Sequence, residues 1–204
     1  YMNTVITGQD EEEIIQAIRT MVRNGLAEGL IVLYSREQDP ILDYLYNEGL
    51  LYVLIGKAYR NVNQTIYVDN DNVLAAREAA QYLIDLGHRR IAYLSGDHTL
   101  IFASDRRAGY MTALIQKIPF REELCVELPE DKEQTGAILE QLLKEKDPPT
   151  AALVSDDILA VALVQTCLSM GISVPGDFSV LSFNNSLFAR LTIPGLTSVD
   201  VNSF

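Results

Sequence analysis

Short apolar runs alternate with helix-patterned segments along almost the whole chain. Runs such as LIVL, LYVLI and AALVS are apolar without alternation, which is typical of strands buried on both faces in a helix-covered parallel sheet. These runs are too numerous for one compact sheet in 204 residues. We therefore predict an α/β fold with two doubly wound lobes, each built on a parallel sheet. The expected strands are residues 2–6, 30–33, 51–55, 66–68, 91–95, 125–128, 151–155, 178–183 and 196–199.

Capping signals place helices between these strands. Asp10 and Glu13 form a D-x-x-E capping box at the start of the first helix. Asp39 with Pro40 begins a short helix that Gly49 ends. Further helices are expected over residues 73–86, 133–146 and 157–170, and over a segment that opens at Ser104 with Ala108, Met111, Leu114 and Ile115 facing inward.

The stretch IYVDNDN, residues 66–72, places four oxygen-bearing side chains directly after an apolar run. A calcium loop starting at Asp69 would need an oxygen at its fifth position, Gly at its sixth and Glu at its twelfth, where this chain has Val, Leu and Ala. We therefore expect no metal there. The remaining roles are a helix cap, supplied by Asn70 or Asp71, and a ligand contact by Asp69.

The charge balance limits the partners of this chain. It has 28 acidic and 16 basic residues, and its formal net charge of −12 repels phosphate backbones, so another segment would have to contact DNA. No apolar run reaches the ~20 residues of a bilayer-spanning helix. A leader of basic, then apolar, then small residues is not recognised. Cys125 and Cys167 lie in apolar surroundings, so we expect two buried thiols in a reducing compartment, with one disulfide as the alternative.

Polar side chains follow nearly every expected strand. Ligands of open parallel sheets bind beyond the carboxyl ends of the strands, so these positions are candidate ligand contacts. Asp71 and Asp157 are explained as helix caps, whereas Arg106, Lys57 and the amide pair 184–185 are not. Carboxylates, amides and a guanidinium beside aromatic rings suit the hydroxyls and the apolar face of a sugar. The residues beyond the strand ends are Tyr34, Ser35, Gly56, Lys57, Asp69, Asn70, Gly96, Asp97, Ser155, Asp156, Asn184 and Asn185, with Phe102 and Phe183 as further aromatic candidates.

Signatures of catalysis are missing from the sequence. Neither a GxGxxG nor a GxxxxGK[ST] phosphate loop occurs, and no GxSxG, HExxH or CxxC motif is present. His88 follows Gly87 at an expected helix end, where a cationic or hydrogen-bonding role explains it, and His98 lies in a polar turn. We therefore predict that the chain is not an enzyme and that it uses no cofactor and no metal.

The segment VDNDNVLAAREAAQYLIDLGHRRIAYLSG resembles the effector-binding domain of the lactose/galactose-repressor (LacI/GalR) family of bacterial regulators. That family carries an acid–Asn pair, an Ala-rich helix and then L-x-x-LGHRRIA-x-x-x-G. Further matches follow in order: SDRRAGY, TAALVSDDILA, GISVPGDFSVLSFNN and IPGLTSV. The resemblance spans essentially the whole chain. Within the family, IGKAY, YVDNDN, SFNN and LTSVDVN are most similar to maltose-operon repressors of the MalR type.

The resemblance implies a periplasmic-binding-protein-like (type I) architecture, with two lobes around a sugar cleft, and a homodimer. Residues 1–69 would form the N-terminal lobe, residues 70–198 the C-terminal lobe, and residues 199–204 the crossover back to the first lobe. It also implies a helix-turn-helix head that contacts operator DNA. That head, the family's first strand and helix, and its closing elements do not occur in these residues, through deletion or disorder.

Site residues carry over from the family one by one. The effector-contacting Arg falls on Arg106, three residues before Gly109, which leaves Arg107 as a surface or salt-bridge residue. The family's effector-contacting Asn is Asp156 here, and its effector Asp is Asn184. Both exchanges keep a hydrogen-bonding group but change its donors, so the identity of the sugar is open. The implied effector-binding set is Arg106, Asp156, Asn184, Lys57, Tyr34 and Phe102.

Three functions compete. The first is a cytoplasmic, sugar-responsive transcription repressor, with maltose or a maltodextrin as the expected effector and no membrane contact. An exported sugar-binding protein of a transporter shares the fold, and an enzyme on a similar scaffold is the third. LGHRRIA and IPGLTSVD favour the repressor. A protein co-effector is an alternative partner, and a structural salt bridge from Arg106 to Asp97 or Asp105 is the alternative to sugar contact. The operator sequence, and whether the effector induces or co-represses, are left open.

Overall fold

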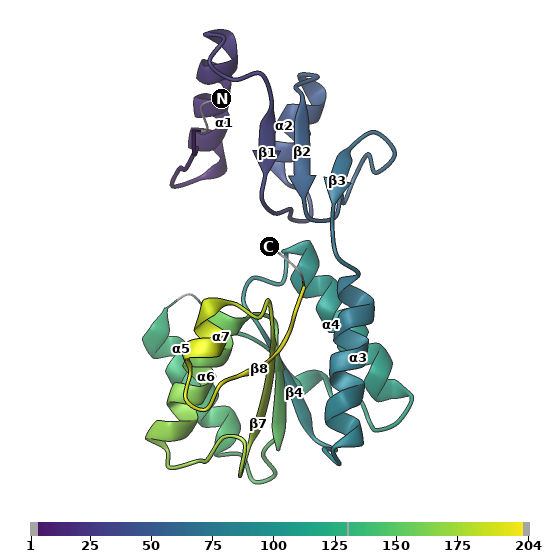
Figure 1. The fold of residues 1–204 in the computed structure, drawn as a ribbon, viewed down its shortest axis with the longest axis vertical. Coiled ribbons are helices and arrows are strands. Elements are labelled where there is room, and N and C mark those ends of the chain that lie inside the picture. Colours follow the sequence, from purple (N-terminus) through teal and green to yellow (C-terminus); the bar gives the residue numbers. More distant parts are fainter. Residues whose placement is uncertain (1–3, 130, 202–204) are drawn as a thin grey trace. The chain divides into compact units, whose positions relative to one another are not determined.

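The computed structural model describes residues 4–129 and 131–201, and Figure 1 shows the chain as a ribbon. The chain divides into two compact units: residues 1–69, called unit 1, and residues 70–204, called unit 2. Each unit has its own parallel sheet flanked by helices, so the predicted α/β fold is confirmed.

Unit 1 carries a three-stranded parallel sheet in the order β1-β2-β3. Leu30 pairs with Tyr52, and Leu54 pairs with Tyr67, which brings the carboxyl ends of the three strands to one edge. All three strands lie within predicted ranges. The elements of unit 1 are α1 (Glu11–Arg23), β1 (Leu30–Val32), α2 (Pro40–Asn47), β2 (Tyr52–Ile55) and β3 (Ile66–Val68).

The helices of unit 1 begin at the predicted capping residues. The Asp10 carboxylate accepts a hydrogen bond from Glu13 N at 2.9 Å, and Asp39 accepts from two N–H groups in the first turn of α2. The strand predicted over residues 2–6 is wrong for residues 4–6, which form no strand, and residues 2–3 lie outside the described part. Val5 is 84% exposed, and an apolar run without a pairing partner does not make a strand.

Unit 2 carries a five-stranded parallel sheet in the order β5-β4-β6-β7-β8. Figure 1 shows α3 and α4 on one side of this sheet and α5 and α6 on the other. Side chains alternate between the two faces: Ile91 and Tyr93 join one buried cluster, and Ala92 and Leu94 join the other. The elements of unit 2 are α3 (Asn72–Asp85), β4 (Ile91–Ser95), α4 (Ile101–Ile115), η1 (Glu122–Leu124), β5 (Cys125–Glu127), α5 (Lys132–Leu143), β6 (Ala151–Val154), α6 (Asp157–Ser169), β7 (Ser179–Phe183), α7 (Leu187–Leu191) and β8 (Thr197–Val199).

Helix α4 begins at Ile101, three residues before its predicted start at Ser104. Leu100 holds the cap position and makes no side-chain capping bond, so the true start lacks the polar signal on which the prediction relied. The predicted inward face is partly wrong as well, because Leu114 is buried but Ile115 is 63% exposed. The buried residues of α4 are Ile101, Ala103, Arg106, Gly109, Tyr110, Ala113 and Leu114. The short elements η1 and α7 were not predicted.

Gly109 allows α3 and α4 to pack closely. A Cβ at this position would lie 2.2 Å from the carbonyl oxygen of Val73 and 2.9 Å from the Cβ of Ala76, both on α3. Any other side chain would have to push the two helices apart, because backbone atoms cannot move aside alone. This contact fixes where the residues one turn earlier on α4 lie against the start of α3.

The two cysteines are free thiols in the structure. Cys167 is fully buried on α6, and burial raises the pKa of its thiol to about 11. Cys125 is half-buried rather than buried as predicted, and burial also raises the pKa of its thiol. Within the described residues, none of the helices has both the length and the apolarity needed to cross a bilayer.

His88 joins the amino-terminal ends of three strands in unit 2. Its Nδ1 lies 2.9 Å from Thr150 Oγ1, just before β6, and its Nε2 lies 3.1 Å from Ser179 Oγ in β7. His88 itself lies shortly before β4, two residues ahead of Arg90. Burial lowers the pKa of His88, so the neutral ring is favoured. A hydrogen-bonding role was predicted for this residue at the helix end, but the ring instead contacts side chains beside β6 and in β7.

Candidate functional site

The strand order of unit 2 reverses direction between β4 and β6. From β4 the chain crosses to β5 on one side and then returns to β6 on the other side of β4. In doubly wound sheets the crevice at such a switch point, beyond the carboxyl ends of the strands, is where ligands bind. The residues that follow β4, β6 and β7 at this edge are therefore the first place to look for a site.

Arg106 lies at this edge, on the second turn of α4. Its side chain is only 4% exposed. The guanidinium carbon lies 4.2 Å from the ring centre of Phe183 and 5.1 Å from that of Phe102. Both distances are in the range of cation–π attraction, and the two rings restrict the plane of the guanidinium. The prediction that Phe102 and Arg106 belong together therefore matches their contact.

Hydrogen bonds hold each nitrogen of the Arg106 guanidinium. Nε donates to Asn72 Oδ1 at 2.9 Å, and Nη1 donates to the carbonyl oxygen of Ser155 at the end of β6. Nη2 donates to Asn184 Oδ1 at 3.5 Å, which is the weakest of the three contacts by its length. Arg106 thus connects α3, β6 and the loop after β7. Asn72 was absent from the predicted site, since no sequence pattern separates it from an ordinary helix-start residue.

Of the adjacent acids Asp156 and Asp157, it is Asp156 that caps the helix, and not Asp157 as expected. Asp156, the predicted effector contact, is the N-cap of α6, and its Oδ1 accepts from the N–H groups of Ile158 and Leu159. Asp157, predicted to be a cap, is 2% exposed and accepts hydrogen bonds from the neighbouring loop and strands. The cap assignment of Asp157 is wrong because α6 begins at Asp157 itself, which leaves the cap position to Asp156. The donors to Asp157 are Ser182 Oγ, Ser198 Oγ at 2.7 Å and Ser186 N at 2.7 Å.

Asn184 and Asn185 turn the chain sharply after β7. Their φ angles are +98° and +44°, in the left-handed region that asparagine tolerates better than most residues. Asn184 N donates to the carbonyl oxygen of Val199 at 2.9 Å, and Asn185 Nδ2 donates to Asp200 Oδ2 at 3.1 Å. The turn therefore holds the Asn184 side chain toward Arg106. Of the predicted effector set, Arg106, Phe102, Asp156 and Asn184 gather at this one edge of unit 2.

The other two predicted residues, Tyr34 and Lys57, follow β1 and β2 in unit 1. Both side chains are exposed, and the Arg36 guanidinium lies 5.9 Å from the ring centre of Tyr34. Ser35 joins the two loops, because its Oγ donates to the carbonyl oxygen of Lys57 at 2.7 Å. The sheet edge of unit 1 therefore presents the two residues together, as expected for neighbouring parallel strands.

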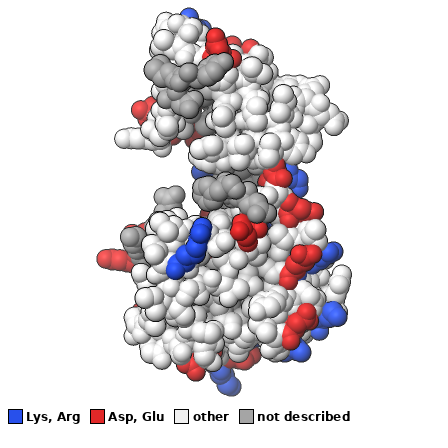
Figure 2. All heavy atoms as spheres, in the orientation of Figure 1, with Lys and Arg blue, Asp and Glu red and all other residues white. Residues whose placement is uncertain are grey.

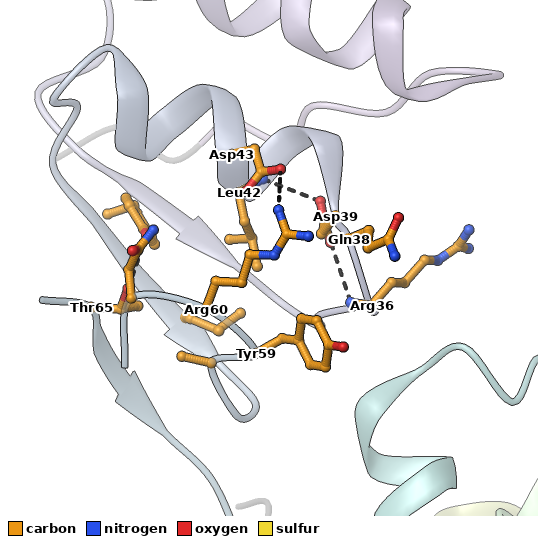
Figure 3. A pocket seen from close by; sticks show the side chains of 12 residues that line it. Arg36, Gln38, Asp39, Leu42, Asp43, Tyr59, Arg60 and Thr65 are labelled. Carbon is orange, nitrogen blue, oxygen red and sulfur yellow. Dashed lines mark hydrogen bonds and ion pairs between the residues drawn. The ribbon is translucent and has the colours of Figure 1, made fainter. Parts of the chain in front are cut away.

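A small pocket lies nearby in unit 1, between α2 and the loops after β1 and β2 (Figure 3). Figure 3 shows Arg60 directed at Asp43, and the two side chains are 3.5 Å apart. The enclosed space of about 20 Å³ holds roughly one water molecule. This pocket is too small for a sugar ring, and its charged residues are engaged in structural contacts.

Charged side chains do not form a single-sign patch on the face of unit 2 that Figure 2 shows. On the face shown in Figure 2, basic and acidic residues are interspersed along the edge of unit 2. This distribution agrees with the net charge of −12 and offers little attraction for a phosphate backbone. Among the residues that the structure describes, no group of three or more His, Cys, Asp or Glu side chains is placed to hold a metal ion.

Comparison with known proteins agrees with this arrangement. The family described as periplasmic binding protein-like domain matches residues 80–203. The HTH-type transcriptional regulator MalR of Streptococcus pneumoniae serotype 4 is 32% identical over 205 residues, which cover 100% of this chain and 60% of that protein. A solved LacI transcriptional regulator from Bacillus cereus subsp. cytotoxis is 40% identical with a TM-score of 0.90, over 96% of this chain and 70% of the other. This chain belongs to the LacI family of transcriptional regulators.

A third similarity concerns a liganded structure. The transcriptional regulator CelR in complex with cellobiose is 28% identical to this chain, with a TM-score of 0.85 over 95% of this chain and 60% of that one. The chain spans 55–60% of the length of the MalR regulators that it matches. The family resemblance read from the sequence, including its MalR-like character, is confirmed. The matched portion is the effector-binding domain, with its periplasmic-binding-protein-like fold.

Proposed function

We propose that this chain senses a neutral sugar, maltose or a short maltodextrin, through the group of residues around Arg106. The observation that carries the proposal is a buried guanidinium, held between two phenyl rings at the switch point of the unit 2 sheet. Asp156 and Asn184 supply acceptors and amide donors beside it, and hydroxyl groups can use both kinds of partner. The long contact from Arg106 Nη2 to Asn184 is the one that a sugar hydroxyl would replace at least cost.

The relatives favour a disaccharide over other ligands. Two relatives are named HTH-type transcriptional regulator MalR, the type that the sequence motifs resemble, and the CelR structure contains the disaccharide cellobiose. Tyr34 and Lys57, at the sheet edge of unit 1, are proposed as effector-binding residues of that unit. A protein co-effector is the second candidate. If the chain answers to a protein and not to a sugar, calorimetric titration with sugars should release no heat.

The proposal predicts that Arg106→Ala abolishes the sugar response of the full-length regulator. Loss of charge-assisted hydrogen bonds to the effector should cost about 3 kcal/mol, which weakens sugar affinity roughly a hundredfold or more. Titration calorimetry with maltose, maltotriose, lactose and ribose measures the effect. Since a ligand shifts two states only by its difference in affinity for them, release of operator DNA by the sugar should be lost as well.

Arg107→Ala is the matched control for that variant. Arg107 is the next residue on α4, is partly exposed, and pairs with Glu122 rather than with the residues around Arg106. It should bind sugar as the wild type does. Arg106→Lys, which keeps the charge but not the planar fork, guards against a folding defect. Wild-type sugar affinity in a folded Arg106→Lys or Arg106→Ala protein would overturn the proposal.

We further propose that the full-length protein is a homodimer in the cytoplasm, joined through α6 and α7. Helix α6 is largely apolar, and a groove of about 300 Å³ lies between it and α7. Phe188, Leu191 and Ile193 are between 57% and 88% exposed along this groove. A second copy presenting the same face would cover them. Sedimentation of the full-length protein as a monomer at micromolar concentration would contradict this proposal.

The proposed whole protein is a DNA-binding repressor and not an enzyme or an exported binding protein. Its relatives are named as HTH-type regulators, and this chain spans only part of them. A head domain outside these residues would therefore contact the operator, because the acidic surface of this chain does not favour it. Salt-sensitive, tight binding of DNA by residues 1–204 alone would contradict the proposal that a separate head domain binds the operator.

A further inference from the structure

Asn72 is a buried polar residue that the proposed function has not used. It is the first residue of α3 and is 3% exposed. Asparagine is a poor helix former, and a buried amide is costly unless its hydrogen bonds are made. An apolar residue would suit this helix and this burial better, so the amide is retained here for its partners.

The partners fix which way the Asn72 amide faces. Its Nδ2 donates to the carbonyl oxygen of Asn70 at 3.2 Å, and its Oδ1 accepts from Arg106 Nε at 2.9 Å. The opposite orientation would set an NH₂ group against the N–H of Arg106 and an oxygen against the carbonyl of Asn70. The carbonyl of Asn70 therefore locks the amide with its acceptor toward the guanidinium.

The close packing of α3 on α4 makes this contact geometrically defined. Gly109 lies one turn after Arg106, and a Cβ added to it would meet the carbonyl oxygen of Val73, the residue after Asn72. The helices therefore meet at the point where Asn72 and Arg106 face each other. With Nε bound by Asn72 and the plane limited by Phe102 and Phe183, the Nη1 and Nη2 edge is directed to the strand ends of β6 and β7.

We propose that Asn72 is a positioning residue for effector recognition: it binds Arg106 Nε and so presents the Nη groups to the ligand. This inference rests on the proposed role of Arg106 in effector binding. Asn72 acts through Arg106. Because the anchor of its amide, Asn70, is also the first residue of unit 2, the same amide secures Arg106 to the point where the chain enters this unit.

Three variants of the full-length protein separate positioning from stability. Asn72→Ala removes the acceptor and should weaken binding of maltose about tenfold, as loss of a hydrogen bond to a charged group does. Asn72→Asp keeps an acceptor for Nε but loses the donor to the carbonyl of Asn70, so it should restore part of the affinity. Asp71→Ala is the matched control, because Asp71 caps the same helix end through Leu74 N and has no part in holding the guanidinium. It should lower the melting temperature while sugar affinity stays at the wild-type value.

A ligand-independent measurement tests the same contact. In ¹⁵N-labelled protein, the Nε–Hε signal of Arg106, assigned by its loss in Arg106→Lys, should exchange slowly with solvent in wild type and in Asp71→Ala. In Asn72→Ala it should shift and exchange faster. If Asn72→Ala does not fold, Asn72→Ser, whose hydroxyl is too short to reach Nε, replaces it.

These measurements test the positioning role of Asn72 separately from the proposed sugar effector. An unchanged Nε–Hε signal in the Asn72 variants overturns the positioning role, whatever the ligand is. Affinity lost equally in Asn72→Ala, Asn72→Asp and Asp71→Ala overturns it too, because a structural defect then accounts for the loss. Failure of the wild type to bind any sugar offered, with the signal changes as expected, rejects the proposed effector but leaves Asn72 as the residue that orients Arg106.

Discussion

The five-stranded sheet of unit 2 is enclosed on both faces, whereas the three-stranded sheet of unit 1 exposes many of its apolar side chains. Every residue of β4 and β6 is buried. In unit 1, all three residues of β3 are exposed, and Ile31 in β1 is 71% exposed. Yet the strands look alike in sequence: LIV and IYV are as apolar as AALV. Apolar composition thus shows that a strand can be buried, and the helices packed against it decide whether it is.

Because of this difference, we expect unit 2 to contribute most of the stability, while the exposed loops of unit 1 are less constrained. Burial of apolar area is the largest favourable contribution to folding, so within the described residues the clusters on the two faces of unit 2 should dominate the free energy of unfolding. The rigid sheet of unit 2 also carries the most constrained part of the candidate site, Arg106. Tyr34 and Lys57, on the less enclosed unit 1, lie on exposed loops and can vary at lower cost to the fold.

Truncating one apolar side chain in each sheet should give the largest difference in stability between the two units. Leu153→Ala in the central strand β6 removes a side chain with 0% exposure and should lower the free energy of unfolding by about 2–5 kcal/mol. Ile31→Ala in β1 should change it by less than about 0.5 kcal/mol, because its side chain is already in solvent. Denaturant titration of residues 1–204 carrying either substitution measures both values. Equal losses would show that the unit 1 sheet is as enclosed as that of unit 2.

A pair of glycines tests how tightly unit 2 is packed. Gly109→Ala should destabilise by about 1–3 kcal/mol, because its new Cβ meets backbone atoms of α3 that cannot yield separately. Gly136→Ala on α5 meets nothing within 4 Å and should stabilise by about 0.5–1 kcal/mol through helix propensity. The same titrations report both. If Gly109→Ala were neutral, the α3–α4 contact would be adaptable, and Asn72 would not be held against Arg106 by it.

Local rules predicted the elements well where one residue carries the signal. Asp10 and Asp39 cap α1 and α2 as expected, since a short polar side chain before an apolar helix has few other uses. Between Asn70 and Asp71, which were both open, the structure selects Asp71. The start of α4 at Ile101 was missed because an uncapped helix end in an apolar stretch leaves no local mark. The Asp156–Asp157 exchange was missed because a one-residue shift in helix start reverses which acid is buried.

Site chemistry was only partly accessible from sequence. Arg106 and Asn184 were candidates from their places beyond strand ends, and the family resemblance added their roles. Their contact requires the strand order of the sheet, which no local pattern encodes. Asn72 looked like any polar residue near a helix start. Its role depends on a partner 34 positions away and on the close approach at Gly109. Polar residues whose partners are distant in sequence therefore need the tertiary structure, whereas caps and apolar periodicity do not.

The smallest expected effect is a pH dependence confined to unit 2. Burial lowers the pKa of His88 below its ordinary value of 6.5, so the unfolded chain binds this proton more readily than the folded one. By linkage, the stability that His88 contributes is complete above pH 6.5 and is lost as the pH falls through the lowered value. Protonation would also make both ring nitrogens donors, which removes the acceptor available to Thr150 or Ser179. His88→Gln should therefore flatten the fall in the denaturant midpoint between about pH 7.5 and about pH 5.5, relative to wild type.

His98→Gln is the comparison for this measurement. His98 is exposed and contacts Glu127 at the opposite, carboxyl-terminal edge of the same sheet. Its variant should keep the part of the slope that His88 contributes. The loss should also appear in the unfolding of unit 2 and not of unit 1, because the bonded partners of His88 all lie in unit 2. A slope that survives in His88→Gln would mean that carboxylates elsewhere account for the acid sensitivity, and that the link between the strand ends does not depend on the neutral ring.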